Sequence, residues 1–313
     1  MLVSEWVQDY NKLNNSFKDT LVFRMGTVAG FFSEYNHMIF AVAYCLKHRI
    51  KFVLSTRDNN FSYAKGWQDY FLPFCEEATN KLHAKFNHRG VPAITKTQDY
   101  SAAVFRHLIG VKYLTYQLFG RIRAQDFSER IVIPELNIDG NLIECCHEII
   151  KQTWLYQPNV KPIIADNIRQ LDLPEEYVGI HIRGGDKVIE HELFKVSDYI
   201  KAVQTLTECK NIYVATDEFD YVKALQTNFP DYTFFTRCRP EASGFVQDAF
   251  NVQSKEYKRT ALLDLFTDVD VLNAGTFFVG AYTSNIGMYL GMRRGVDKCY
   301  CLDNNDWRIW AVN

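Results

Sequence analysis

The sequence predicts an α/β protein with two Rossmann-like domains, and three observations support this. Its 313 residues exceed the length of one typical domain and are suited to two. Strand-like apolar runs alternate with helix-like segments in both halves, a pattern typical of parallel sheets with right-handed crossovers. Residues 157–176 hold three prolines and separate the halves. We therefore expect domains at 1–165 and 166–313, with their parallel sheets facing across a cleft.

The first half begins with a strand, a glycine-containing turn and a helix, for which Ser33 is the expected N-cap. An aromatic-rich loop at 58–75 follows the second strand, and its rings either pack in the core or line an acceptor site. The elements expected in this half are strands at 21–25 and 51–54, and helices at 34–48, over most of 97–130, and at 141–156.

The second half alternates more regularly, as expected for a parallel sheet covered by helices on both faces. A loop that carries Ser243 follows its third strand. The expected strands are 177–183, 212–215, 233–235, 276–280 and 299–302, and the expected helices are 197–208, 219–228, 256–272 and 284–294.

Composition excludes several classes of protein. The net charge is −2, with 35 basic and 37 acidic residues, so no overall basic excess indicates nucleic acid as a partner. No apolar run approaches the roughly 18 residues that a membrane helix needs, and the first residues do not resemble a secretory leader, so we expect a cytoplasmic location. The eight cysteines form no CxxC pair, which favours reduced, scattered thiols over a zinc site.

The strand at 177–183 ends in chemically suggestive residues. His181 and Arg183 precede Gly184 and Gly185, so two cationic or polar side chains stand where a buried strand gives way to a glycine turn. An arginine can donate two parallel hydrogen bonds to a phosphate, and glycines allow the backbone to approach closely. Ligands of open α/β sheets bind at this carboxyl edge. The segment therefore indicates an anion site.

Two further strands end in polar groups at the same expected edge. Asp217 follows the strand at 212–215, and Ser284 and Asn285 stand where the strand at 276–280 meets a helix. The N-terminus of a helix supplies N–H groups and a positive dipole end, which suit phosphate. Asp217 and Ser284 are also suited to capping the helices that follow them. No G-x-G-x-x-G and no Gly-Lys-Ser/Thr motif occurs, which argues against dehydrogenases and P-loop NTPases.

Together, these motifs resemble the fucosyltransferase superfamily that includes α1,6-fucosyltransferases, nodulation fucosyltransferases and protein O-fucosyltransferases. That superfamily carries an H-x-R motif before a short polar turn, a later A-T-D motif and a final G-T/A-x-x-S-N/Q motif. The matching segments, which run in the expected order within residues 20–290, are His181-Ile-Arg183, Ala215-Thr216-Asp217 and Gly280-Ala-Tyr-Thr-Ser284-Asn285, with a glycine loop at 30–37 and an aromatic segment at 60–67.

The resemblance implies a GT-B architecture with an acceptor domain followed by a sugar-nucleotide domain. It implies an inverting transfer of fucose from GDP-fucose to a glycan acceptor, without a metal ion or other cofactor. The implied roles are β-phosphate binding and leaving-group stabilisation by Arg183, support of the phosphate or ribose by His181, guanine recognition by Asp217, diphosphate contact by Ser284 and Asn285, a contribution to donor binding by Ser243, and an approach to the nucleotide by the loop at Gly30.

This chain departs from the superfamily pattern at two points. The α1,6 and nodulation branches usually carry an arginine or another bulkier residue where Gly184 stands. In an ungapped alignment, the suggested catalytic base of the α1,6 enzymes corresponds to His191, which stands between Glu190 and Glu192, so any of the three is a candidate base.

Two alternative functions stay open. The chain could use another donor, such as GDP-mannose, GDP-rhamnose or UDP-xylose, or it could be a non-catalytic protein that binds nucleotides or carbohydrates.

Overall fold

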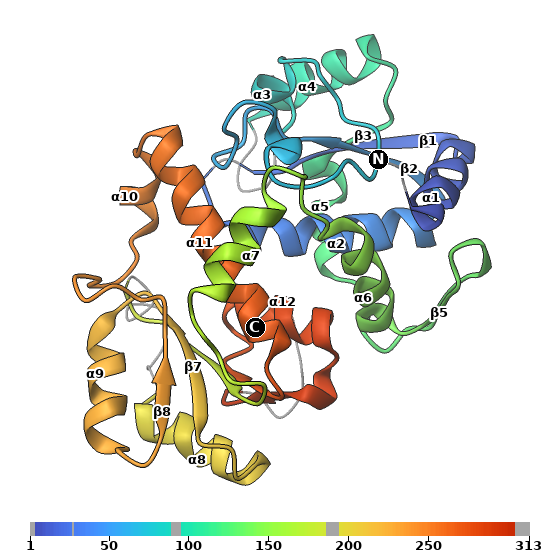
Figure 1. Cartoon of the computed structure of the whole chain (residues 1–313). Helices are drawn as coiled ribbons and strands as arrows, with labels where there is room; N and C mark the ends of the chain where they lie inside the picture. Colours follow the sequence, from blue (N-terminus) through green and yellow to red (C-terminus); the bar gives the residue numbers. More distant parts are fainter. Residues whose placement is uncertain (1–3, 27, 89–94, 186–193, 304–313) are drawn as a thin grey trace. The chain divides into compact units, whose positions relative to one another are not determined.

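The computed structural model describes residues 4–26, 28–88, 95–185 and 194–303. The chain divides into two compact units, Met1–Gln157 and Pro158–Asn313 (Figure 1). The boundary expected after residue 165 falls inside helix α7 (Lys161–Arg169), which belongs to the second unit.

The N-terminal unit is built on a parallel three-stranded sheet of order β2-β1-β3. Helix α2 connects β1 to β2 and is buried over almost its whole length, because it packs against β2 on one side and α6 on another. The elements of this unit are α1 (Glu5–Ser16), β1 (Asp19–Arg24), α2 (Phe31–Lys47), β2 (Ile50–Ser55), η1 (Gly66–Asp69), α3 (His83–Phe86), α4 (Lys96–Leu108), β3 (Tyr113–Leu114), α5 (Thr115–Arg123), β4 (Ile131–Ile133), η2 (Pro134–Leu136), β5 (Ile138–Gly140) and α6 (Leu142–Thr153).

One expectation for this unit is wrong. Helix α2 begins at Phe31 with Gly30 as its N-cap, so Ser33 lies in the first turn instead of capping it. Most of 97–130 is helical, as expected, but it forms two helices, because Gly110 adopts a positive φ of 68° after α4 and the chain then enters β3, which pairs with β1. Short-range apolar spacing does not reveal such a break, since the pairing that stabilises β3 comes from a distant strand.

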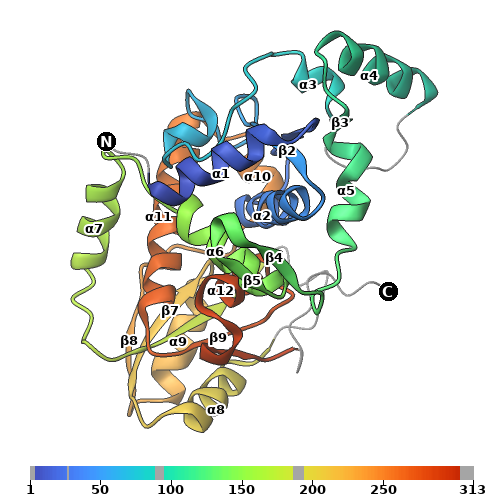
Figure 2. The same cartoon turned by 90° about the vertical axis from the view of Figure 1, so that its right-hand side faces the viewer.

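The C-terminal unit contains a five-stranded sheet of order β10-β9-β6-β7-β8, in which all neighbouring strands run parallel. Alternate residues of β6 face opposite layers: Ile180 packs in a core with α8 and α9, whereas Gly179 faces α11, where a Cβ atom would lie 2.9 Å from Leu272. Helices thus cover both faces (Figures 1 and 2). The elements are α7, β6 (Val178–Ile182), α8 (Val196–Leu206), β7 (Asn211–Thr216), α9 (Phe219–Asn228), β8 (Thr233–Phe235), α10 (Gln247–Asn251), α11 (Lys255–Ala274), β9 (Phe278–Gly280), α12 (Asn285–Arg294), η4 (Val296–Lys298) and β10 (Cys299–Cys301).

All eight cysteines are free thiols, as expected from their spacing. Within the described ranges, no helix combines the length and apolar character needed to cross a bilayer.

A buried side chain of α1 completes the edge of the N-terminal sheet. Asn14 donates from Nδ2 to the carbonyl of Phe52 at 2.9 Å, and its Oδ1 accepts the N–H of Phe52 at 2.8 Å. Asn14 therefore satisfies both backbone groups of an edge-strand residue, as a neighbouring strand would do.

We predict that Asn14→Ala lowers the free energy of unfolding by about 1–3 kcal/mol, because the buried N–H and C=O of Phe52 lose their partners. Asn15→Ala is the matched control, since Asn15 is exposed one position along the same helix, and we expect it to change stability by less than about 0.5 kcal/mol. Urea denaturation of both variants measures the difference, and equal stabilities would contradict the bridging role of Asn14.

Candidate active site

Three strands of the C-terminal sheet end side by side. Ile182 of β6 pairs with Thr216 of β7, and Ile180 pairs with Val279 of β9. The residues that follow these strands therefore emerge at one edge, as the alternation in the sequence predicts.

The Asp217 carboxylate ties the loops at this edge together. Its Oδ1 accepts the N–H of Gly184 at 2.8 Å, and its Oδ2 accepts the N–H of Phe245 at 3.1 Å. Its backbone carbonyl also accepts the N–H of Gly244 at 2.9 Å. Asp217 thus holds the turn after β6 and the loop after β8 in one arrangement. It does not cap α9, whose N-cap is Glu218.

Arg183 lies beside the Asp217 carboxylate and the Phe245 ring. Its Nε is 3.7 Å from Oδ2 of Asp217, and its Cζ is 5.5 Å from the ring centroid of Phe245. An acidic group on one side and an aromatic face on another restrict the guanidinium, and the side chain is still 29% exposed. Arg183 is therefore held in place at the sheet edge while part of it faces solvent.

Two glycines make the loop contact possible. Gly185 has a φ of +60°, and a Cβ atom there would lie 2.4 Å from the carbonyl oxygen of Phe245; Gly244 has a φ of +102°, and its Cβ would lie 2.7 Å from the Cα of Gly185. A Cβ at Gly184 would lie 2.5 Å from the carboxylate of Glu218. A bulkier residue at 184, as the α1,6 and nodulation branches usually carry, would therefore require the flexible Glu218 side chain to move.

His181 is buried between the strands and is neutral. Burial, with a contribution from the charge of Arg183, lowers its pKa to about 3. Its Nδ1 lies 3.5 Å from Oγ of Ser284, which itself accepts the N–H of Gly287 at 3.0 Å. We assign the Ser284 hydroxyl as the donor to Nδ1, which leaves the ring proton on Nε2. His181 can therefore donate one hydrogen bond to a ligand but carries no charge near neutral pH.

Ser284 is the N-cap of α12, and Asn285 is the first residue of that helix. The capping interpretation of Ser284 is thus confirmed, and a cap does not exclude contact with a ligand. The N-terminus of α12 opens beside His181, at the carboxyl end of β9. Ser243 is exposed and forms an antiparallel bridge with Glu218, next to the Gly244 contact.

A cavity of about 310 Å³ opens beside this edge and has a strongly polar lining. Thr216 at the end of β7 forms one wall, and the loop after β8 and helix α11 form the others. The lining residues are Thr216, Arg237, Cys238, Arg239, Glu241, Ala242, Tyr257, Asp264 and Asp268. Its volume lies at the lower end of the roughly 300–1,000 Å³ typical of small-molecule sites.

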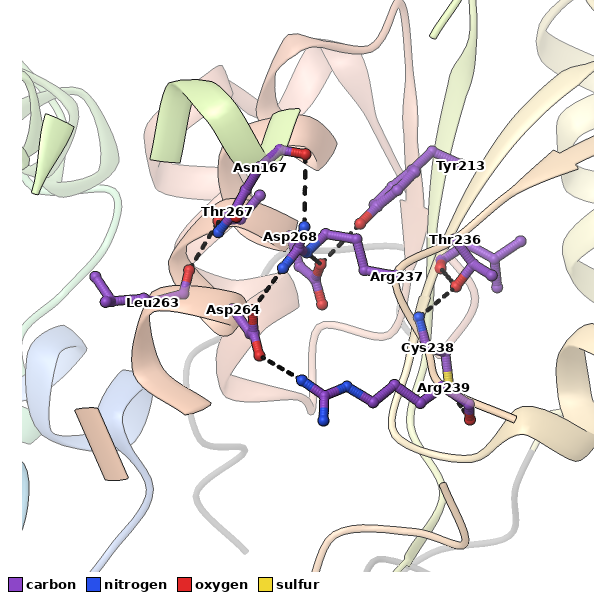
Figure 3. A network of polar contacts seen from close by, with 11 residues as sticks. Asn167, Tyr213, Thr236, Arg237, Cys238, Arg239, Leu263, Asp264, Thr267 and Asp268 are labelled. Atoms are coloured by element: carbon purple, nitrogen blue, oxygen red, sulfur yellow. Dashed lines mark hydrogen bonds and ion pairs between the residues drawn. The ribbon is translucent and has the colours of Figure 1, made fainter. Parts of the chain in front are cut away.

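The inner wall of this cavity is an ion-pair network (Figure 3). Arg237 donates to Asp264 at 2.5 Å, and Arg239 lies 3.8 Å from the second oxygen of Asp264. Asp268 accepts the hydroxyl of Tyr213 at 2.7 Å. Burial raises the pKa of Asp268 to about 6, although Tyr213 and Arg237 oppose this shift. The wall is therefore polar and internally paired.

The sequence interpretation missed this cavity. A signal was available, because Asp264 and Asp268 are spaced i, i+4 within an apolar helix and must share a face. Their partners Arg237 and Arg239 come from a separate loop, and only the tertiary structure brings them together.

In the N-terminal unit, Gly30 is the N-cap of α2, and the first turns of this helix carry a buried carboxylate. Glu34 of α2 accepts the N–H of Gly26 at 2.6 Å. Most aromatic residues nearby belong to the core: Trp67 stacks on Phe71 with centroids 4.5 Å apart, and Tyr70 is buried. Tyr63 is 37% exposed.

The candidate bases Glu190, His191 and Glu192 lie outside the described residues. In the part of the chain that is described, no three His, Cys, Asp or Glu side chains are placed to hold a metal ion.

Comparison with known proteins agrees with the motifs found in the sequence. The family model for alpha-(1,6)-fucosyltransferase N- and catalytic domains matches residues 14–289. The chain belongs to this family. The match confirms the superfamily resemblance and covers every described strand end of the candidate site.

An alpha-(1,6)-fucosyltransferase of Drosophila melanogaster is 22% identical over 282 residues, which are 85% of this chain but 42% of that protein. The chain thus spans less than half the length of this relative. Fucosyltransferase NodZ from Bradyrhizobium has a similar structure, with a TM-score of 0.52 at 15% identity over 87% of this chain and 93% of NodZ. A NodZ alpha-1,6-fucosyltransferase crystal soaked with GDP-fucose gives 0.51 at 16% identity over 88% and 92%. These likenesses confirm the GT-B fold class.

We predict that Gly185→Ala is much more destabilising than Gly110→Ala. Both glycines have positive φ, but a Cβ at Gly110 meets nothing within 4 Å, whereas at Gly185 it strikes the backbone of Phe245. The φ penalty alone is about 1–2 kcal/mol, so we expect Gly185→Ala to exceed Gly110→Ala by about 2 kcal/mol or more. Thermal unfolding measures both, and similar losses would contradict the loop contact.

Proposed function

We propose that this chain transfers fucose from GDP-fucose to a hydroxyl group of a glycan acceptor, with inversion and without a metal ion. Membership of the alpha-(1,6)-fucosyltransferase family supports the activity, and the likeness to a NodZ crystal soaked with GDP-fucose supports the donor. The observation that carries the proposal is Arg183, held by Asp217 and Phe245 at the sheet edge beside the N-terminus of α12.

This edge provides what a departing diphosphate needs. Arg183 supplies a fixed positive charge and a forked set of donors, neutral His181 adds one N–H, and α12 adds its N-terminal N–H groups with the cap residues Ser284 and Asn285. Preorganised donors of this kind stabilise the negative charge that grows as the bond from sugar to phosphate breaks. In this proposal Arg183 is catalytic, because it faces the leaving group.

The cavity next to Thr216 is the best place in this unit for the nucleobase. Its lining includes Ala242, which precedes Ser243 and Gly244 in the loop that contacts the turn after β6, so a nucleotide with its diphosphate at Arg183 can direct its base there. The exposed ring of Tyr257 offers a face for stacking, and the carboxylates of the wall can accept the N–H groups of guanine. Guanine recognition by Asp217 stays a prediction, with both its oxygens occupied by backbone N–H groups.

We propose that the N-terminal unit binds the acceptor, with Tyr63 as an exposed ring that can face a sugar, and that the loop at Gly30 approaches the nucleotide. The base that deprotonates the acceptor hydroxyl is assigned to Glu190, His191 or Glu192, which follow the phosphate turn directly in sequence.

We predict that Arg183→Ala lowers the rate of fucose transfer about 10²–10³-fold, because the leaving diphosphate loses its main cationic partner. Arg183→Lys keeps the charge but not the fork, so it should recover only part of the rate. Release of GDP from GDP-fucose, measured with an acceptor panel in the presence of EDTA, provides the assay. Arg169→Ala is the matched control, since Arg169 lies 75% exposed on α7 in the same unit. Near-normal turnover by Arg183→Ala would refute the mechanism.

We predict that Tyr257→Ala raises the Kd for GDP about tenfold or more, because stacking of a base on an aromatic ring contributes roughly 1–3 kcal/mol. Tyr257→Phe keeps the ring and should bind GDP as the unmodified chain does. Isothermal titration with GDP and UDP measures both the loss and the preference for guanine. An unchanged Kd in Tyr257→Ala would place the base elsewhere.

A further inference from the structure

The turn between β9 and α12 is anchored by a carboxylate that lies just beyond the C-terminal end of β10. Oδ1 of Asp303 accepts the N–H of Tyr282 at 2.9 Å, and Oδ2 accepts the N–H of Thr283 at 2.9 Å. The hydroxyl of Thr283 donates to the same Oδ2. Asp303 therefore binds two consecutive backbone N–H groups and one side chain of a single turn.

A fourth hydrogen-bond donor also points at Asp303, so only an ionised carboxylate can accept all four hydrogen bonds. The thiol of Cys301 donates to Oδ1 of Asp303 at 2.7 Å. An ionised carboxylate accepts about four hydrogen bonds and donates none, whereas an asparagine side chain would direct an NH₂ group at one of these donors. Burial tends to raise the pKa of Asp303, but the hydrogen bonds from Cys301, Thr283 and Tyr282 outweigh it and hold the pKa below its usual value.

The anchored turn controls where α12 begins. The N–H of Ser284 donates to the carbonyl of Ala281 at 3.1 Å, and a Cβ at Gly287 would lie 2.2 Å from that same carbonyl oxygen. The turn thus lies directly against the first turn of α12, with no space between them. A shift of the turn moves Ser284, whose hydroxyl faces His181 and caps the helix.

We propose that Asp303 is a positioning residue for donor binding, which fixes the turn that presents Ser284 and the N-terminus of α12 to the diphosphate. This inference rests on the proposed function of the site. Asp303 acts through the turn: its own negative charge is surrounded by four donors and therefore does not oppose the bound anion as a bare carboxylate would. Holding the turn in the free protein removes an ordering cost that the donor would otherwise meet on binding.

The test compares Asp303→Asn with Asp297→Asn, which removes a charge from an exposed position of η4 in the same unit. We expect Asp303→Asn to raise the Kd for GDP and the KM for GDP-fucose about tenfold to a hundredfold, since hydrogen bonds to a charged group are the stronger kind. The KM for the acceptor and the kcat at saturating donor should change less than threefold, which corresponds to about 0.65 kcal/mol. Asp297→Asn should change none of these values.

A second pair of variants tests the turn without altering Asp303. Thr283→Val removes one donor to the carboxylate at nearly constant shape, and Thr283→Ser keeps it. We expect Thr283→Val to weaken GDP binding about threefold to tenfold and Thr283→Ser to restore it. If both Asp303→Asn and Thr283→Val bind GDP with unchanged affinity, the positioning role is overturned. A change confined to kcat or to the KM for the acceptor would overturn it as well. Failure of the unmodified chain to bind GDP would instead overturn the proposed function, so the two failures are distinguishable.

Discussion

The Asp217 carboxylate is the interaction on which the rest of the site depends. It follows β7, yet it binds the turn after β6 through Gly184 and the loop after β8 through Phe245. Three neighbouring strands are therefore joined beyond their ends by one acidic side chain. Because a carboxylate can satisfy several N–H groups that the sheet itself leaves unpaired, Asp217 orders both loops at the edge where ligands of open α/β sheets bind.

The remaining features of the site depend on these hydrogen bonds from Gly184 and Phe245 to Asp217. Because the two loops are held together, Gly185 lies directly against Gly244, and this close backbone contact is possible only because neither residue has a side chain. The same loop contact also brings the ring of Phe245 under Arg183 and Asp217 beside it, so the guanidinium is oriented before any anion arrives. His181, made neutral by burial, adds a donor without adding repulsion between two cations.

Much of this could be predicted from the sequence because parallel strands impose a shared edge. The positions of His181, Arg183, Asp217 and Ser284 follow from the strand alternation, since each lies just beyond or at the end of a strand. Strand alternation could not predict the break between α4 and α5 or the polar cavity wall at Asp264. Each of these features depends on contacts between segments distant in sequence. A helix spacing pattern records which residues share a face, but not which loop supplies their partners.

The comparison between the two anchoring carboxylates explains why both are aspartates. Asp217 accepts N–H groups from two separate loops, and Asp303 accepts them from two consecutive residues of one turn. Each stands beyond the end of a strand of the same parallel sheet. A short acceptor-only side chain can reach a turn next to its own strand, whereas the longer glutamate would have to fold back and lose more rotamer freedom. The sheet thus holds the turn after β6 and the turn before α12 by the same physical means. In the proposed function, the diphosphate would therefore meet backbone that is already fixed, and ordering these turns would not reduce its binding free energy.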